Sequence, residues 1–235
     1  SSPFSQSRLS LISYLLITFE NRNRMRITAV LILLTFISCE NKPVKDENYY
    51  FNLPFLFTER TFCYTNQNDT SEKSYWKMKT YLSNNDTFLL TKVYDSKKRI
   101  TDSTIEMVSN GNSIIIVNTM VNYDQEGNKI LSDCKIVDSL LFVSNLKKGE
   151  ILEMALLFKD HRTAKDCGLF RERSVKTIEG DQKIFYNYLT FKILDTEEGY
   201  SYEADMTYEK NKGLVAYEMT LPDGTVKNYV LTSIE

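Results

Sequence analysis

The chain has 235 residues and a formal net charge of −2, with 42% hydrophobic and 26% charged residues. Once a targeting segment is set aside, this length gives one domain that buries roughly 70% of its unfolded surface and needs no disulfide or metal for stability. The near-neutral charge, with no basic stripe of interleaved aromatics, argues against nucleic acid as a partner. The 15 tyrosines and 13 phenylalanines favour strands, because aromatic side chains fit pleated, half-buried surfaces.

Residues 25–38 have the organisation of an export signal. Met25 and Arg26 begin it, and residues 27–37 form an apolar run broken only by two threonines. A membrane span needs about 20 apolar residues, whereas a secretory signal uses roughly 7–15. A buried core helix, the alternative, would show a polar face at 3.6-residue spacing, which is absent here. We therefore predict a signal peptide over residues 25–38 and assign residues 1–24 to upstream translation outside the mature protein.

The next motif, Phe36-Ile37-Ser38-Cys39, resembles the lipobox of bacterial lipoproteins, in which an aliphatic, an uncharged and a small residue precede a cysteine. Phe36 stands where the family usually has Leu. The resemblance implies transfer of diacylglycerol to the Cys39 thiol, cleavage before Cys39 and acylation of the new amine. Several acyl chains give stable anchoring where one chain is marginal. An ordinary signal peptide and a noncleaved anchor are the alternatives.

The same resemblance implies a location in the cell envelope, with the membrane as a partner through acylated Cys39. The residue after it is Glu40 and not the Asp that retains some lipoproteins in the inner membrane, which favours the outer membrane, facing the periplasm or the surface. Residues 39–48 are polar, as expected for a tether. Residues 49–235 then form a single β domain.

Strict alternation of apolar and polar residues dominates this domain. Tyr200, Tyr202 and Tyr208 share one face of residues 200–209, which is the period of a half-buried strand. Similar runs predict strands at 75–82, 87–94, 103–109, 113–123, 129–137, 150–158, 169–178, 183–194, 213–220 and 225–234. Residues with turn preferences separate them at 83–86, 110–112, 125–128, 179–181, 197–199, 211–213 and 222–224. We expect an all-β fold, an antiparallel meander curved into a half-barrel or barrel with little helix.

Three segments leave alternatives open. Residues 150–160 are compatible with a helix or a strand. Residues 184–193 are apolar on both faces, which indicates a strand that is central or covered by another layer. The aromatic residues 49–57 either provide that cover or plug one end of a barrel.

The last hairpin, in residues 212–231, resembles the closing strands of exported half-barrel proteins related to the lipoprotein carriers LolA and LolB. The resemblance spans about 20 residues and implies a half-barrel. It implies no function, because one fold serves many functions.

Residues suited to catalysis are scarce. The one histidine, His161, lies in a polar run, so a histidine-based triad or multi-histidine metal site is not expected. Residues 122–128 place oxygen ligands at alternate positions around Gly127, as a calcium loop does, but a hairpin turn explains the same residues. We therefore predict no enzyme, no catalytic residues, no metal site and no cofactor.

The chain has three cysteines in addition to Cys39. In an oxidising compartment Cys134 and Cys167 are our preferred disulfide pair, which would stabilise the fold by about 3–4 kcal/mol. Buried free thiols at Cys63, Cys134 and Cys167 are the alternative.

Two classes of function fit the sequence. The first is a binding module whose interior, rich in Tyr, Phe and Met, takes an apolar ligand such as a lipid, although the same aromatics could simply fill the core. The second is a structural or interaction protein of the envelope that meets another protein. An empty apolar cavity favours the first class, and a filled core with an exposed apolar patch favours the second.

Overall fold

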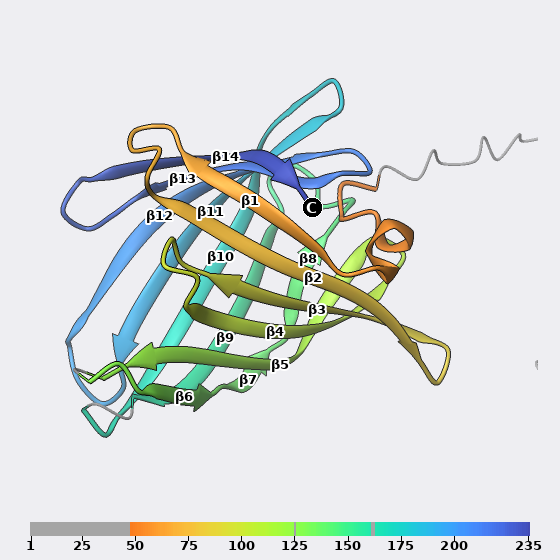
Figure 1. Ribbon diagram of the computed structural model, residues 1–235. Coiled ribbons are helices and arrows are strands. Elements are labelled where there is room, and N and C mark those ends of the chain that lie inside the picture. The colour runs from red at the N-terminus through yellow and green to blue at the C-terminus, as the bar shows by residue number, and fades with distance from the viewer. Residues whose placement is uncertain (1–47, 125, 161–162) are drawn as a thin grey trace, which may run out of the picture. The chain divides into compact units, whose positions relative to one another are not determined.

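A computed structural model describes residues 48–124, 126–160 and 163–235. Their strands form one antiparallel sheet that curves strongly into a nearly closed barrel (Figure 1). The predicted all-β meander is thus confirmed. Cys39, the signal peptide, the tether to residue 47 and His161 lie outside the described residues.

The elements follow one another along the chain with short connections. They are η1 (a 3₁₀ helix, Leu53–Phe57), β1 (Arg60–Asn66), β2 (Lys73–Ser83), β3 (Asp86–Tyr94), β4 (Ile100–Ser109), β5 (Asn112–Tyr123), β6 (Lys129–Asp133), β7 (Lys135–Asp138), β8 (Leu140–Val143), β9 (Ile151–Asp160), β10 (Lys165–Glu179), β11 (Gln182–Ile193), β12 (Gly199–Glu209), β13 (Gly213–Thr220) and β14 (Val226–Ile234). Spatial order follows chain order, except that β1 pairs with β14, β7 with β9 and β8 with β5.

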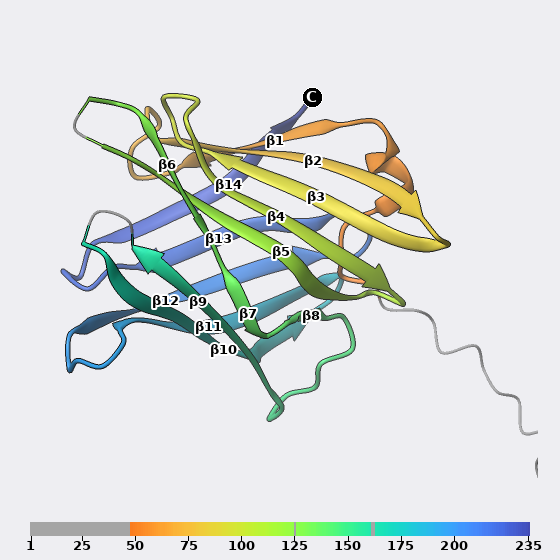
Figure 2. The same ribbon diagram turned by 90° about the horizontal axis from the view of Figure 1, so that it is seen from below.

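The barrel is closed by the short strands in the middle of the chain. β6 pairs with β5, β7 pairs with β9, and β8 returns to β5. The segment therefore crosses from one edge of the sheet to the other, between β5 and β9 (Figure 2). The Cys134 amide at the crossing donates to the Asn118 carbonyl at 2.9 Å. This arrangement covers edges that would otherwise expose unpaired backbone groups.

Most predicted strands are confirmed, with three corrections. The run at 129–137 is two strands, because the chain changes partner from β5 to β9 at Cys134. β8 was not predicted, since four residues are too short to display a period. β1 was not predicted either, because its last five residues are buried on both faces and show no alternation.

The open alternatives are also resolved. Residues 150–160 form strand β9 and no helix. Residues 184–193 lie in β11, which is central between β10 and β12. The turns use the predicted residues, with positive φ at Asn84, Asn85 and Asn211 and at Gly180 and Gly224.

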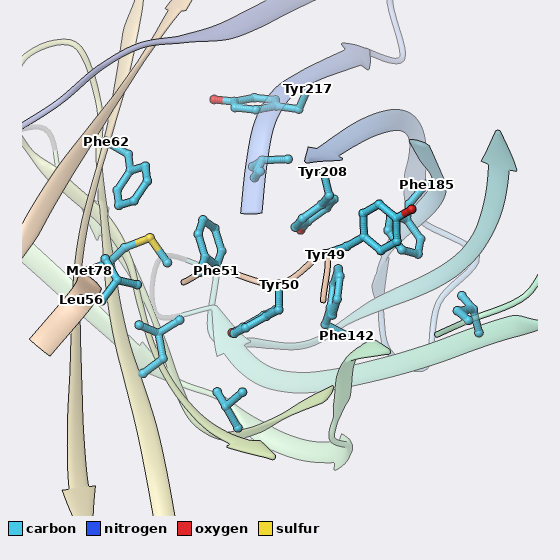
Figure 3. Packing of buried hydrophobic residues seen from close by; sticks show 14 of the residues in the cluster. Tyr49, Tyr50, Phe51, Leu56, Phe62, Met78, Phe142, Phe185, Tyr208 and Tyr217 are labelled. Atoms are coloured by element: carbon cyan, nitrogen blue, oxygen red, sulfur yellow. The ribbon is translucent and has the colours of Figure 1, made fainter. Parts of the chain in front are cut away.

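The aromatic residues 49–51 plug one end of the barrel. Tyr49, Tyr50 and Phe51 are buried among residues of many strands. The Tyr50 ring lies 5.1 Å from that of Phe142, which lies 4.9 Å from Tyr208 (Figure 3). The Tyr49 amide donates to Ser144 Oγ at 2.8 Å. The plug interpretation of residues 49–57 therefore holds for residues 49–51, whereas Phe55 and Phe57 are 43% and 48% exposed.

In the part of the chain that the structure describes, no helix has the length and apolar character required of a membrane span.

The plug generates a stability prediction at Gly213. A Cβ atom there would lie 2.3 Å from the Phe51 ring, and the residue has a φ of +86°. Gly224 has nearly the same φ, +82°, but nothing within 4 Å of a Cβ atom. Both Gly213→Ala and Gly224→Ala carry backbone strain, and only the first also displaces the plug.

We expect Gly213→Ala to lower the free energy of unfolding by about 1–3 kcal/mol more than Gly224→Ala does. Chemical denaturation of both variants measures this difference. Equal losses would mean that Phe51 does not hold the plug against β13.

Candidate ligand-binding cavity

A cavity of about 230 Å³ lies inside the barrel, next to the plug. At its deep end it meets Tyr50 and Phe142, whose exposed fractions are 3% and 1%. At its other end the lining side chains are only partly buried, namely Trp76, Val93, Met120, Leu169 and Leu189. These residues lie near the strand ends opposite the plug. The cavity is thus closed by aromatic side chains at one end and opens toward the other.

Most of the cavity wall is apolar. Ile115, Met154 and Leu156 form a small buried cluster on β5 and β9, with Leu141 and Leu169 packed against it. Alternation directs the β5, β9 and β10 side chains of this set inward, because successive residues of a strand point to opposite faces. An apolar wall of this kind favours ligands that carry aliphatic or aromatic groups.

The polar part of the wall comes first from β4, whose inward face carries Asp102, Thr104 and Glu106. Thr104 Oγ1 donates to Asp102 at 2.8 Å, and Asn118 Nδ2 on β5 donates to the same carboxylate at 3.1 Å. Burial raises the pKa of Asp102, against the effect of these two donors. The Asn118 Oδ1 atom is buried with no hydrogen-bond partner in the described residues.

Glu106 is buried deeper, at 6% exposure, beside the plug. The Tyr50 hydroxyl donates a hydrogen bond to its Oε2 atom. Burial raises the pKa of Glu106 above its ordinary value of 4.5, and the Tyr50 hydroxyl together with Arg171 and Arg173 opposes this rise. The plug thus contributes a polar group to the cavity as well as closing it.

Two arginines of β10 face the cavity from the other side. Arg171 and Arg173 are exposed by only 6% and 2%, and each donates to the Leu141 carbonyl, at 2.7 and 3.2 Å. Among the residues described, no carboxylate oxygen lies within 4.0 Å of either guanidinium. Burial, followed by the positive charge of Arg173, lowers the pKa of Arg171. The interior therefore holds two buried cations opposite two carboxyl groups whose pKa values are raised.

This arrangement can bind a molecule and orient it. An apolar wall holds hydrocarbon, and a few convergent polar groups fix which end enters first. The described residues contain no cluster of three or more histidine, cysteine, aspartate or glutamate residues suited to a metal ion.

The residues selected from the sequence lie elsewhere. Cys63, Cys134 and Cys167 are free thiols in the structure, and burial raises the pKa of Cys134 to about 11. The structure contains no disulfide between Cys134 and Cys167, and this disulfide stays a prediction for the oxidised protein. Of the residues considered for a calcium loop, Asn122 and Tyr123 end β5. In the turn that follows, Gly127 has a φ of +85° and Asp124 accepts bonds from the amides of Glu126 and Asn128.

The cavity residues were missed at the sequence level, although a signal for them was present. In β10, alternation places Arg171 and Arg173 on the same face as Leu169 and Val175. A charged residue on the apolar face of a strand is unusual and indicates an interior polar site. For Glu106 the signal was weaker, because the opposite face of β4 is itself apolar, with Ile105 and Met107.

No protein-family model matches the chain, and no curated protein matches it. Two solved structures show a limited similarity to the chain. One is a Bacteroides fragilis protein described as exported and with a YmcC-like fold, at 12% identity and a TM-score of 0.45, covering 75% of this chain and 94% of that one. The other is a Parabacteroides distasonis protein described as a lipoprotein, at 10% identity and a TM-score of 0.49, covering 80% and 98%. Function must therefore be argued from the residues of this chain.

The buried carboxyl group of Glu106 generates a pH prediction. A raised pKa means that the folded protein holds this proton more tightly than the unfolded chain does. The contribution of Glu106 to stability is fully present below pH 4.5, the ordinary pKa, and is lost as the pH rises through the raised value. Glu106→Gln is neutral throughout, so its free energy of unfolding should fall less than that of the wild type as pH rises above 4.5.

Tyr50→Phe provides the matched comparison. Removing the hydroxyl withdraws a hydrogen bond to the ionised Glu106 carboxylate, so the pKa of Glu106 should rise further. The loss of stability with rising pH should therefore continue to higher pH than in the wild type. Denaturation at a series of pH values measures both variants. Parallel curves for wild type and Glu106→Gln would contradict this assignment.

Proposed function

We propose that the chain is an exported lipoprotein whose barrel interior binds a ligand with an apolar body, of the size of a single short lipid chain. The observation that supports this proposal is the cavity, which remains open inside a barrel whose other end is densely packed. A filled core would instead have favoured a purely structural role.

The size of the cavity limits the ligand. An apolar cavity of about 150 Å³ stays dry and binds benzene, so 230 Å³ has room for a molecule about half as large again. A chain of about eight carbons is of this size. A whole two-chain phospholipid is several times larger.

Binding also affects the stability of the fold. A ligand that binds the folded barrel and not the unfolded chain raises the free energy of unfolding as its concentration rises.

A substitution that fills the cavity tests the proposal. Leu169 lines it from β10 and is partly buried, whereas Tyr188 on the adjacent β11 points outward and is 39% exposed. We expect Leu169→Trp to weaken binding of 1-octanol by about tenfold or more, a loss of about 1.4 kcal/mol. Tyr188→Trp should leave binding unchanged. Isothermal titration calorimetry measures both affinities.

If wild type and Leu169→Trp bound 1-octanol with equal affinity, the ligand would lie outside the cavity. If the wild type did not bind 1-octanol at all, the proposal would be overturned. Either result would favour the second class of function, an envelope interaction protein. For that role the outward face of β5 offers Ile116 and Val117, which are 43% and 44% exposed.

The anchor at Cys39 is a separate part of the proposal and has a separate test. When the full chain is expressed in bacteria with labelled palmitate, we expect label on the wild type and on Cys63→Ser, which alters a buried thiol of β1. Cys39→Ser should carry no label, because the thiol that accepts diacylglycerol is gone. An unlabelled wild type, or a labelled Cys39→Ser, would contradict the lipoprotein assignment.

A further inference from the structure

The two arginines of the cavity differ in how well their hydrogen-bonding groups are satisfied. All three nitrogens of the Arg173 guanidinium have a partner: Nε donates to Asn187 Oδ1 at 2.7 Å, Nη1 to the Leu141 carbonyl at 3.2 Å and Nη2 to Met206 Sδ at 3.3 Å. Its guanidinium also lies between 5.4 and 5.8 Å from three aromatic ring centroids. Arg173 is thus held in place by the fold.

Arg171 is not satisfied in this way. Its Nη2 donates to the Leu141 carbonyl, but its Nε is buried and has no partner in the described residues. A buried donor without a partner costs about 1–3 kcal/mol, and more when it is charged. The residue is only 6% exposed, and it lines the cavity. An acceptor that enters the cavity would supply the missing partner.

The surroundings of Arg171 define the rest of that molecule. In the register of the sheet, Arg171 pairs with Met154 on β9 and Leu189 on β11, and the next inward residue toward the open end is Leu169. On β9, β10 and β11 the wall between Arg171 and the opening is thus aliphatic. A ligand there needs an anionic head at its inner end and a hydrocarbon tail toward the opening.

We infer that the cavity binds a single-chain carboxylic acid of about eight carbons, with its carboxylate at Arg171 and its tail directed toward the open end of the barrel. This inference rests on the proposed function and adds a charge requirement to it. A carboxylate fits the planar fork of a guanidinium, and such charge-assisted bonds are stronger than neutral ones. Asp102 and Glu106 face the same space, but both oxygens of Asp102 and Oε2 of Glu106 already accept hydrogen bonds from the donors described above.

The test compares two ligands that differ only in the head group, octanoate and 1-octanol, by calorimetry at neutral pH. We expect the wild type to bind octanoate about tenfold or more tightly than octanol, from the strength of hydrogen bonds between charged groups. In Arg171→Met the ratio of the two affinities should fall to about one. Lys176→Met removes a positive charge from the outward face of the same strand and should keep the preference.

Folding of the variant is itself informative. Replacing an incompletely paired buried ion by an apolar residue of similar length is often neutral or stabilising. Arg171→Met should therefore unfold at the same or higher denaturant concentration than the ligand-free wild type. Arg171→Lys, which keeps the charge but lacks the fork, should show a reduced preference.

The outcomes separate this inference from the proposed function. Equal affinity of the wild type for octanoate and octanol would overturn the inference and leave the binding function intact. A preference for octanoate that persists in Arg171→Met would overturn the assignment to Arg171. Binding of neither ligand would overturn both proposals.

Discussion

The structure depends on how the interior of a wide β-barrel is filled. A barrel of about eight strands is just filled by its own inward side chains, and its diameter grows with the number of strands. The sheet described here has 14 strands, so its own side chains do not fill it throughout. Residues Tyr49 to Phe51 enter one end and complete an aromatic core with Phe142 and Tyr208. The cavity is the part of the interior that this plug does not reach.

The polar residues of the interior follow from the same constraint. Space that remains open tolerates long charged side chains, and β10 supplies Arg171 and Arg173 there. Arg173 is bound by Asn187 and belongs to the packed end. Arg171 is two residues closer to the opening, and its Nε lacks a partner in the described residues. The boundary between core and site thus runs between these two arginines.

Much of the fold could be predicted from the sequence because alternation and turn residues are local signals. The period of residues 200–209 and the asparagines of the turns identify strands and hairpins without knowledge of the rest of the chain. β1 and the crossing at Cys134 could not be predicted, since the first is buried on both faces and the second changes its partner strand.

The site was harder to predict for a different reason. Arg171 and Glu106 lie 65 positions apart in the sequence, and only closure of the barrel places both on one cavity. The plug role of residues 49–57 was one of two alternatives, because its aromatic composition suits any buried surface. The resemblance to a lipobox at Cys39, by contrast, rests on four consecutive residues. These lie outside the described residues, so the anchor stays a prediction.

The central claim is that an amphipathic ligand occupies the interior of the barrel. Its most direct test is solution NMR of the protein with octanoate, through nuclear Overhauser effects between the methyl group of the ligand and methyl groups of the protein. The account predicts contacts to the inward methyl groups of Met120, Leu169 and Leu189, and none to the outward Ile116 and Val117. Contacts to Ile116 and Val117 without contacts to the inward set would contradict it.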